Sequence, residues 1–348
     1  MDRGTQNTSK LLWIENIRAY SIVAVITIHS IYSALLLFGE DSLATTGISI
    51  YKSLMNLMWW GVPCFLMITG YLLLNPEKEI GYEKILKKYI PRMLAVLLIF
   101  GTVFAWMELF FADRSISVHQ IAIALLNVFE GETWAHLWYV YCLIGIYLLL
   151  PVYRILAKNM SDKDLKYYLV VNFIFISAVR LIEVFGVQCG FYIHVLTIYP
   201  FWLFMGLAFK REALFLSRRN SIMLLCASTA LLVILTIAQY LGGASGLSVL
   251  FGYDSPFVVA QAIAIFNLIR EAKTAENLRP LMQEVGDKSF GIYLVHMFFV
   301  NVFYKVLDIN PFGKWGGLLL VTLIGINLVL SYTCTWILKK LPLFRKIL

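Results

Sequence analysis

The sequence predicts an all-α, polytopic membrane protein, a bundle of about ten transmembrane helices with both termini in the cytoplasm. Of its 348 residues, 60% are hydrophobic and 14% are charged, whereas soluble domains carry about 25% charged residues. The mean hydropathy is +0.77. Long apolar segments follow one another along the chain, and basic residues gather in alternate loops. These observations indicate a chain that lies within a bilayer.

Most of the apolar segments are long enough to cross the hydrocarbon core as helices, which takes about 20 residues. In order they cover residues 12–38, 50–74, 89–112, 134–157, 165–186, 191–209, 221–241, 253–270, 287–307 and 315–339. The stretch 117–129 is shorter and interrupted by polar residues, so we predict a re-entrant or interfacial helix there. The connecting loops are short, which predicts a single domain over residues 1–348 without an appended soluble domain.

Basic residues predict the orientation. Most of the 29 Lys and Arg residues lie near the termini or in the loops after the second, fourth, sixth and eighth segments; the outer loops hold Lys52, Arg114, Lys305 and Lys314. The positive-inside rule therefore places both termini in the cytoplasm. Because topology accounts for the net charge of +8, no nucleic-acid partner is expected. The sequence leaves no indication of oligomeric state.

Several classes of site are not indicated. The five cysteines show no CxxC spacing, and the histidines form no HExxH motif, so neither a disulfide nor a metal site is predicted. The sequence also has no Walker or GxGxxG loop, which argues against a nucleotide-driven pump.

Arg18 and His29 are ionisable residues of the first apolar segment, and they are the strongest candidates for function. Eleven helical residues make three turns plus about 20° and rise about 16 Å, so both side chains share one face. If the hydrocarbon core begins at Ala19, Arg18 lies at its border and His29 near the midplane. Ionisable residues at such depths are costly and usually functional. A structural alternative is that Arg18 pairs with Glu15 and His29 bonds to neighbouring backbone.

The chain resembles acyltransferase family 3, the membrane proteins that transfer acyl groups, most often acetyl, to cell-surface carbohydrates. Arg18 and His29 match the Arg-x10-His signature of that family, and Glu15 matches the acidic residue that usually precedes it. Four further stretches are similar to family motifs: Gly61–Tyr71, with Thr69 where serine is commoner, His136–Tyr139 with Tyr147–Pro151, Gly286–His296, and, more loosely, Lys84–Arg92. Among subtypes the chain is most similar to short stand-alone members, such as those proposed to O-acetylate enterobacterial common antigen.

The resemblance implies an O-acetyltransferase of the bacterial inner membrane that uses cytoplasmic acetyl-CoA and no metal. The acceptor would be a hydroxyl of a surface polysaccharide or of its lipid-linked precursor. Arg18 would position the donor, because a guanidinium offers forked donors to phosphate. His29 would act as general base or form an acyl-histidine. The alternative class is a transporter or channel that uses both residues as a proton or anion relay.

Other candidates complete the predicted site. One helical face carries Ser289, Tyr293 and His296, and His296 lies near the depth of His29. We assign His296 to catalysis and the other two residues to donor binding. The alternative interpretation is that all three form a polar seam between packed helices. Lys88 and Arg92 are candidate contacts for coenzyme A phosphates. Glu15 and three residues near the outer mouth are candidate acceptor contacts: His136, Trp138 and Tyr139. Arg180 and Glu183 form a charged pair within the fifth segment.

Overall fold

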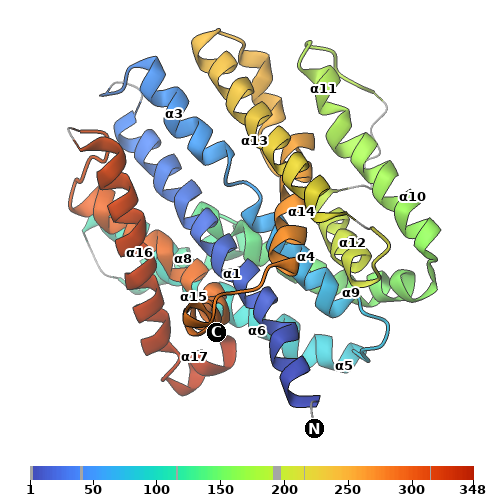
Figure 1. Ribbon diagram of the computed structural model, residues 1–348. Helices are drawn as coiled ribbons and strands as arrows, with labels where there is room; N and C mark the ends of the chain where they lie inside the picture. Colours follow the sequence, from blue (N-terminus) through green and yellow to red (C-terminus); the bar gives the residue numbers. More distant parts are fainter. Residues whose placement is uncertain (1–2, 40–41, 115–116, 191–196, 215, 314) are drawn as a thin grey trace. The chain divides into compact units, whose positions relative to one another are not determined.

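The structure is a computed structural model that describes residues 3–39, 42–114, 117–190, 197–214, 216–313 and 315–348. These residues form helices joined by turns, with no strand among them (Figure 1). The chain divides into two compact units. Unit 1 comprises Met1–Asn75 and Met160–Thr335, and unit 2 comprises Pro76–Asn159 and Trp336–Leu348. Lys314, assigned above to an outer loop, lies outside the described residues.

Unit 1 contains most of the long helices. In chain order they are α1 (Arg3–Ala34), α3 (Thr45–Asn56), α4 (Gly61–Leu73), α10 (Asp162–Asn172), α11 (Arg180–Glu183), α12 (Ile198–Lys210), α13 (Arg218–Leu241), α14 (Pro256–Glu271), α15 (Arg279–Asn301) and α16 (Gly316–Leu338), whose last residues belong to unit 2. Short π-helical turns continue α1, α10 and α15: η1 (Leu35–Gly39), η5 (Phe173–Ala178) and η8 (Val302–Val306). Two 3₁₀ turns, η6 (Ser245–Leu250) and η7 (Glu276–Leu278), precede α14 and α15.

The core of unit 1 is built around α1, which packs most extensively on α15 and also contacts α4 and α14. Its buried face carries Ile17, Ile22 and Ile26, each fully buried. At the end of α1, Ile31 and Ala34 join a cluster that includes Val300 of α15 and Leu320 of α16. This packing fixes the helix that carries Arg18 and His29 against the helix that carries His296.

The second apolar segment is interrupted near its middle. α3 ends at Asn56 and α4 begins at Gly61, with a turn over residues 57–60. Asn56 is buried in this break, where its Nδ2 donates to Oγ1 of Thr236 at 3.0 Å and its Oδ1 accepts from Nε1 of Trp59 at 3.2 Å. Pro63 falls in the first turn of α4, where a missing N–H breaks no helical bond. A side chain at Gly61 would place its Cβ 2.9 Å from the Ser21 carbonyl oxygen of α1.

Glycines also set the contact between α4 and α12. The backbone of Leu203 lies against Gly70, and the backbone of Met67 lies against Gly206, both so closely that a Cβ on either glycine would overlap the neighbouring carbonyl oxygen. Small residues of this kind allow two helices to approach closely. The glycines of the Gly61–Tyr71 motif are therefore packing residues in unit 1.

Unit 2 contains the remaining helices. They are α5 (Tyr82–Lys84), α6 (Ile90–Val96), α7 (Thr102–Asp113), α8 (Val118–Glu130), α9 (Trp138–Asn159) and α17 (Pro342–Ile347), with π-helical turns η2 (Ile85–Tyr89) and η3 (Leu97–Gly101) and the 3₁₀ turn η4 (Ala135–Leu137). α6 packs on α9 and α17, and α7 packs on α8. The stretch 117–129 is the helix α8, where Oγ of Ser117 caps the N-terminus by accepting from the Gln120 amide at 3.1 Å.

The predicted all-α polytopic architecture is confirmed. Within the described residues, each predicted apolar segment coincides with helices, and eight helical stretches are long and apolar enough to cross a membrane. The two shorter segments are α12, with 13 residues, and α14, with 16. At 1.5 Å per residue α12 extends about 20 Å, less than the hydrocarbon core. The first residues of the segment 191–209 lie outside the described residues.

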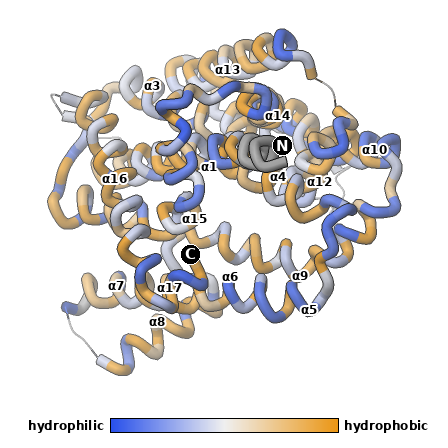
Figure 2. Tube along the Cα trace, turned by 60° about the horizontal axis from the view of Figure 1, so that its bottom comes forward, coloured by the Kyte–Doolittle hydropathy of each residue, from blue (hydrophilic) through white to orange (hydrophobic). Residues whose placement is uncertain are grey.

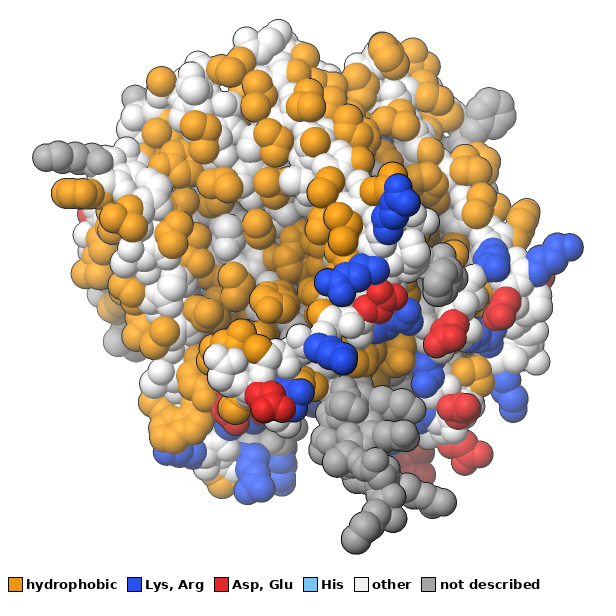
Figure 3. Space-filling view, viewed as in Figure 1, with side chains coloured by type: hydrophobic (Ala, Val, Ile, Leu, Met, Phe, Trp, Pro, Cys, Tyr) orange, Lys and Arg blue, Asp and Glu red, His pale blue; other side chains and the backbone are white. Residues whose placement is uncertain are grey.

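The surface of the helices fits a lipid environment. Along α13, hydrophobic residues occupy most of the length and hydrophilic residues gather at one end (Figure 2). In the space-filling view, hydrophobic side chains cover α3 and α13, whereas Lys, Arg, Asp and Glu side chains gather in the lower half of the view (Figure 3). Exposed apolar side chains on α13 include Ile222, Leu231 and Ile234. In water such a surface would be costly, whereas acyl chains can cover it.

Candidate functional site

Two histidines of unit 1 are in direct contact. His29 of α1 and His296 of α15 lie 2.9 Å apart between Nδ1 of His29 and Nε2 of His296, with ring centroids separated by 4.9 Å. The side chain of His296 is fully buried, whereas His29 is half-buried. The structure therefore brings together the two histidines that the sequence placed at similar depth. Of the two residues, only His29 retains partial exposure.

The partners of His296 determine the tautomer of the pair. Nδ1 of His296 lies 2.6 Å from the Tyr293 carbonyl oxygen, and a carbonyl only accepts, so this nitrogen carries a proton. When both rings are neutral, Nε2 of His296 accepts the hydrogen of His29 Nδ1. The lone pair of His29 is then on Nε2. In this arrangement His296 orients His29 so that Nε2 is the nitrogen able to take up a proton.

The helix α16 supports His296 through a row of polar side chains. Nδ2 of Asn327 donates to the His296 carbonyl oxygen at 3.2 Å, and Oγ of Ser331 donates to Oδ1 of Asn327 at 2.8 Å. Both side chains are fully buried, where an unsatisfied polar group would be expensive. Sequence reasoning missed this row. The sequence pattern that could have revealed this row is the i, i+4, i+8 spacing of Asn327, Ser331 and Thr335 within an apolar segment.

The predicted polar face of α15 is buried within unit 1. Ser289 and Tyr293 are 4% and 6% exposed, and Tyr293 contributes its backbone carbonyl to His296. Gly291 on this helix allows close contact with the side chain of Thr335. The face therefore packs helices together and orients a histidine. The assignment of Ser289 and Tyr293 to donor binding stays a prediction.

Arg18 is held by the neighbouring turn of α1. Its Nη1 donates to Oε1 of Glu15 at 2.7 Å, and the side chains of Arg18 and Glu15 are 31% and 15% exposed. Glu15 in turn lies against α15, where a Cβ on Gly286 would be 2.5 Å from the Glu15 carbonyl oxygen. The ion pair considered as a structural alternative is thus present. It also holds the guanidinium in a fixed orientation while a third of the side chain stays accessible.

The predicted donor contacts Lys88 and Arg92 lie in unit 2. Lys88 is exposed. Arg92 donates from Nε to the Ile347 carbonyl oxygen and from Nη2 to the Leu348 oxygen, both at 2.9 Å. These bonds fasten α17 to α6 and occupy the guanidinium with backbone oxygens. The assignment of both residues to donor phosphates stays a prediction.

The three predicted acceptor contacts near the outer mouth lie in unit 2, and two of them are buried. His136 is 1% and Tyr139 7% exposed, whereas Trp138 is half-buried. Beside them, the ring of Trp134 stacks on Phe104 at 4.2 Å between centroids, and its Nε1 donates to Oε1 of Glu108 at 2.8 Å. Sequence analysis did not single out Glu108 or Trp134, although Glu108 is an acidic residue within an apolar segment.

The described residues contain no group of three or more His, Cys, Asp or Glu side chains that could hold a metal ion. Unit 1 instead offers a pair of imidazoles between packed transmembrane helices, one of them on the partly exposed residue His29. Such a pair suits proton transfer to or from a bound ligand.

Fold and site together define a polytopic helical membrane protein with a histidine pair in its apolar core. The family model described as an acyltransferase domain, that of acyltransferase family 3, matches residues 11–338. The chain therefore belongs to this family and is a membrane acyltransferase. Comparison with curated proteins and with solved structures gives no match.

Proposed function

We propose that this acyltransferase moves an acetyl group from cytoplasmic acetyl-CoA to a hydroxyl of a surface polysaccharide or its lipid-linked precursor, in the inner membrane of a bacterium. The contact between His29 and His296 is the observation that carries this proposal. A general base needs a lone pair aimed at the incoming hydroxyl and a partner that fixes its tautomer. The contact with His296 at Nδ1 supports this role for His29, because it leaves Nε2 as the nitrogen with the lone pair.

The proposed step uses His29 as base. The acceptor oxygen attacks the thioester carbonyl carbon, and Nε2 of His29 takes the hydroxyl proton. The coenzyme A thiolate leaves and receives that proton from the imidazolium. The acetyl group thus passes from sulfur to oxygen with no other reactant.

Arg18 is proposed to position the donor. Coenzyme A carries phosphates that stay in water, whereas its pantetheine arm can enter the apolar core. A guanidinium eleven residues from His29 on the same helix face is about 16 Å away along the axis. Glu15 holds this guanidinium, which lowers the cost of ordering it for a phosphate or a pantetheine amide.

The purified protein with acetyl-CoA and an acceptor glycan tests the proposal. We expect His29→Ala to lower kcat by about 10²- to 10⁴-fold, the usual contribution of a general base, while the protein remains folded. His119→Gln, an exposed histidine on α8, is the matched control and keeps activity. Undiminished transfer by His29→Ala would show that the assigned role is wrong.

The same reaction distinguishes a base from a covalent relay. Intact-protein mass spectrometry, after the protein is mixed with acetyl-CoA alone and rapidly quenched, shows an added acetyl mass if a side chain becomes acylated, as His29 would in a covalent relay. No such adduct is expected for direct transfer. An adduct that disappears in His29→Ala would replace the general-base step by an acyl-histidine.

A further inference from the structure

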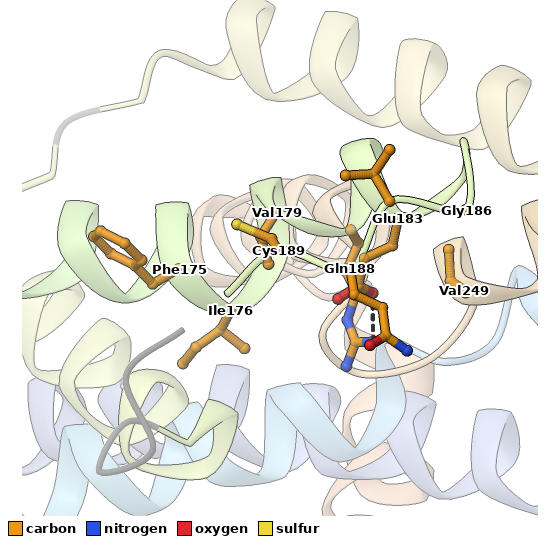
Figure 4. A pocket seen from close by; sticks show the side chains of 10 residues that line it. Phe175, Ile176, Val179, Glu183, Gly186, Gln188, Cys189 and Val249 are labelled. Carbon is orange, nitrogen blue, oxygen red and sulfur yellow. Dashed lines mark hydrogen bonds and ion pairs between the residues drawn. The ribbon is translucent and has the colours of Figure 1, made fainter. Parts of the chain in front are cut away.

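A cavity of about 700 Å³ lies at the end of α11 in unit 1, apart from the residues assigned to the proposed reaction. Its size falls within the range of about 300–1,000 Å³ that is usual for small-molecule sites. One wall is apolar, with Phe175, Ile176 and Val179, and the other carries Arg180, Glu183 and Gln188 (Figure 4). The cavity therefore combines an apolar surface with a small set of planar polar groups.

The polar wall is fixed by two ion pairs. Nη1 of Arg180 lies 2.8 Å from Oε2 of Glu183, and Nη2 lies 2.6 Å from Oδ2 of Asp254. Each side chain is about a third exposed, between 28% and 35%. The second oxygens, Oε1 of Glu183 and Oδ1 of Asp254, take no part in these pairs. A purely structural ion pair at the end of a span would not need to face a cavity.

A reversal of the chain completes the cavity. Gly186 has φ +74, a backbone conformation that glycine adopts without strain, and the segment after it runs back along the helix. This return brings Gln188 beside the Arg180–Glu183 pair and Cys189 beside Val179 (Figure 4). The amide of Gln188 adds both a donor and an acceptor to the polar wall.

The charges select the class of ligand. Arg180 is already balanced by two carboxylates, so the cluster has a net charge of −1 and repels phosphates and carboxylates. An ammonium group would only donate, and it would face the Arg180 cation. A hydroxyl both donates to the carboxylates and accepts from the guanidinium and the Gln188 amide. A ligand that carries many hydroxyls on an apolar ring framework matches both the polar wall and the apolar wall of the cavity.

We propose that this cavity binds a neutral saccharide. The fifth apolar segment ends here on the side that the positive-inside rule places outside the cytoplasm. Provided that the proposed function holds, the saccharide is part of the acceptor glycan, held at a position separate from the histidine pair. Binding itself requires no acyl donor.

Cys189 supplies a direct readout of occupancy because it lines the cavity. The purified protein is treated with N-ethylmaleimide, and the alkylation rates of Cys189 and Cys226 are followed by peptide mass spectrometry. Cys226 is exposed on α13 and is not part of the cavity, so it serves as an internal reference. The probes are chitotriose and maltotriose as neutral saccharides, trigalacturonate as an anionic one, and ethanolamine as a cation.

We expect the neutral trisaccharides to slow alkylation of Cys189 at least threefold without changing Cys226. Gln188→Ala and Glu183→Gln should abolish this protection. Glu83→Gln removes a more exposed ion pair, with Lys87 in unit 2, and this variant should keep the protection of Cys189. Since Gln188 is exposed and outside the ion pairs, its replacement leaves the fold intact even if Glu183→Gln does not.

Absence of protection by both neutral saccharides overturns the proposal, as does protection by trigalacturonate or ethanolamine alone. The outcome is independent of catalysis. Protection without acetyl transfer leaves the saccharide site standing and removes the proposed function. Acetyl transfer without protection supports the proposed function and overturns the saccharide site.

Discussion

His296 lies behind His29 in the core of unit 1, with 2.9 Å between Nε2 of His296 and Nδ1 of His29, and is itself fully buried. We therefore expect the two histidines of this pair to have different roles. We propose that the partly exposed His29 contacts the reacting group, whereas the fully buried His296 acts through its neighbour as a positioning residue. The sequence-based assignment of His296 to catalysis stays a prediction, and the two roles give different results on substitution.

Replacement of the positioning histidine should slow the reaction without weakening donor binding. In His296→Leu, Nδ1 of His29 loses the imidazole that accepts from it, so the tautomer with a lone pair on Nε2 is favoured less strongly, with only the backbone bond of His29 to Val25 remaining. We expect kcat to fall at least about tenfold, equivalent to about 1.4 kcal/mol, with the KM for acetyl-CoA little changed. In the double variant with His29→Ala the losses should not add. Additive losses would mean that the two histidines act separately.

Loss of Asn327 should destabilise unit 1 through the backbone of His296. Asn327→Ala removes a bond to the His296 carbonyl oxygen, and side-chain hydrogen bonds between membrane helices contribute about 0.6 kcal/mol on average and at most about 1.7. Thermal unfolding in detergent should show that the free energy of unfolding decreases by this amount. The control is Thr333→Ala, an exposed hydroxyl on α16 that bonds only within its own helix at 2.8 Å. Equal effects of the two substitutions would contradict the proposed support.

A methyl group at Gly286 should push α1 away from α15. Its Cβ would lie 2.5 Å from the Glu15 carbonyl oxygen, and overpacking of this kind costs about 1–3 kcal/mol. Gly286→Ala should therefore lower the unfolding temperature and reduce transfer. Gly325→Ala on α16, where a Cβ meets no atom within 4 Å, should leave both unchanged. Normal stability of Gly286→Ala would show that the two helices separate readily.

The two roles considered for Arg92 give different results. In the structure Arg92 binds the backbone oxygens of Ile347 and Leu348, so Arg92→Ala should expose α17 to limited proteolysis. Lys87→Ala removes a neighbouring surface charge and should not. A rise in the KM for acetyl-CoA with unchanged proteolysis would favour the phosphate-binding role instead.

The ion pair of Arg18 can be tested with a substitution that retains the charge. Lysine has no planar fork and cannot reproduce paired donor geometry. We expect Arg18→Lys to raise the KM for acetyl-CoA about tenfold, or about 1.4 kcal/mol, with a smaller change in kcat. An unchanged KM would mean that Arg18 does not position the donor and forms only its ion pair with Glu15.

The architecture was largely predictable because bilayer insertion imposes long apolar helices and a charge asymmetry. The shared face of Arg18 and His29 followed from helical periodicity alone. The position of the break after Asn56 depends on tertiary contacts. Glycine and proline weaken a helix, and Gly61 and Pro63 lie just after the break, but the hydrogen bond from Asn56 to Thr236 depends on a helix far along the chain.

The candidate site was predicted by residue type and depth rather than by contact. Periodicity placed His29 and His296 at similar depths, yet the direct bond between them depends on how α1 and α15 pack through Gly286. The role of Asn327 was missed because a lone amide in an apolar segment has no motif. The ion pair of Arg180 with Asp254 joins the helix α11 to the turn before α14, which no local pattern could reveal.

The reciprocal glycines Gly70 and Gly206 have a mechanical consequence. Since backbone already meets backbone there, α4 and α12 are at their shortest possible separation and can neither tighten under pressure nor swell without losing their contact. We therefore expect that any motion of unit 1 that admits the proposed donor comes from the other helices, while α4 and α12 stay in contact.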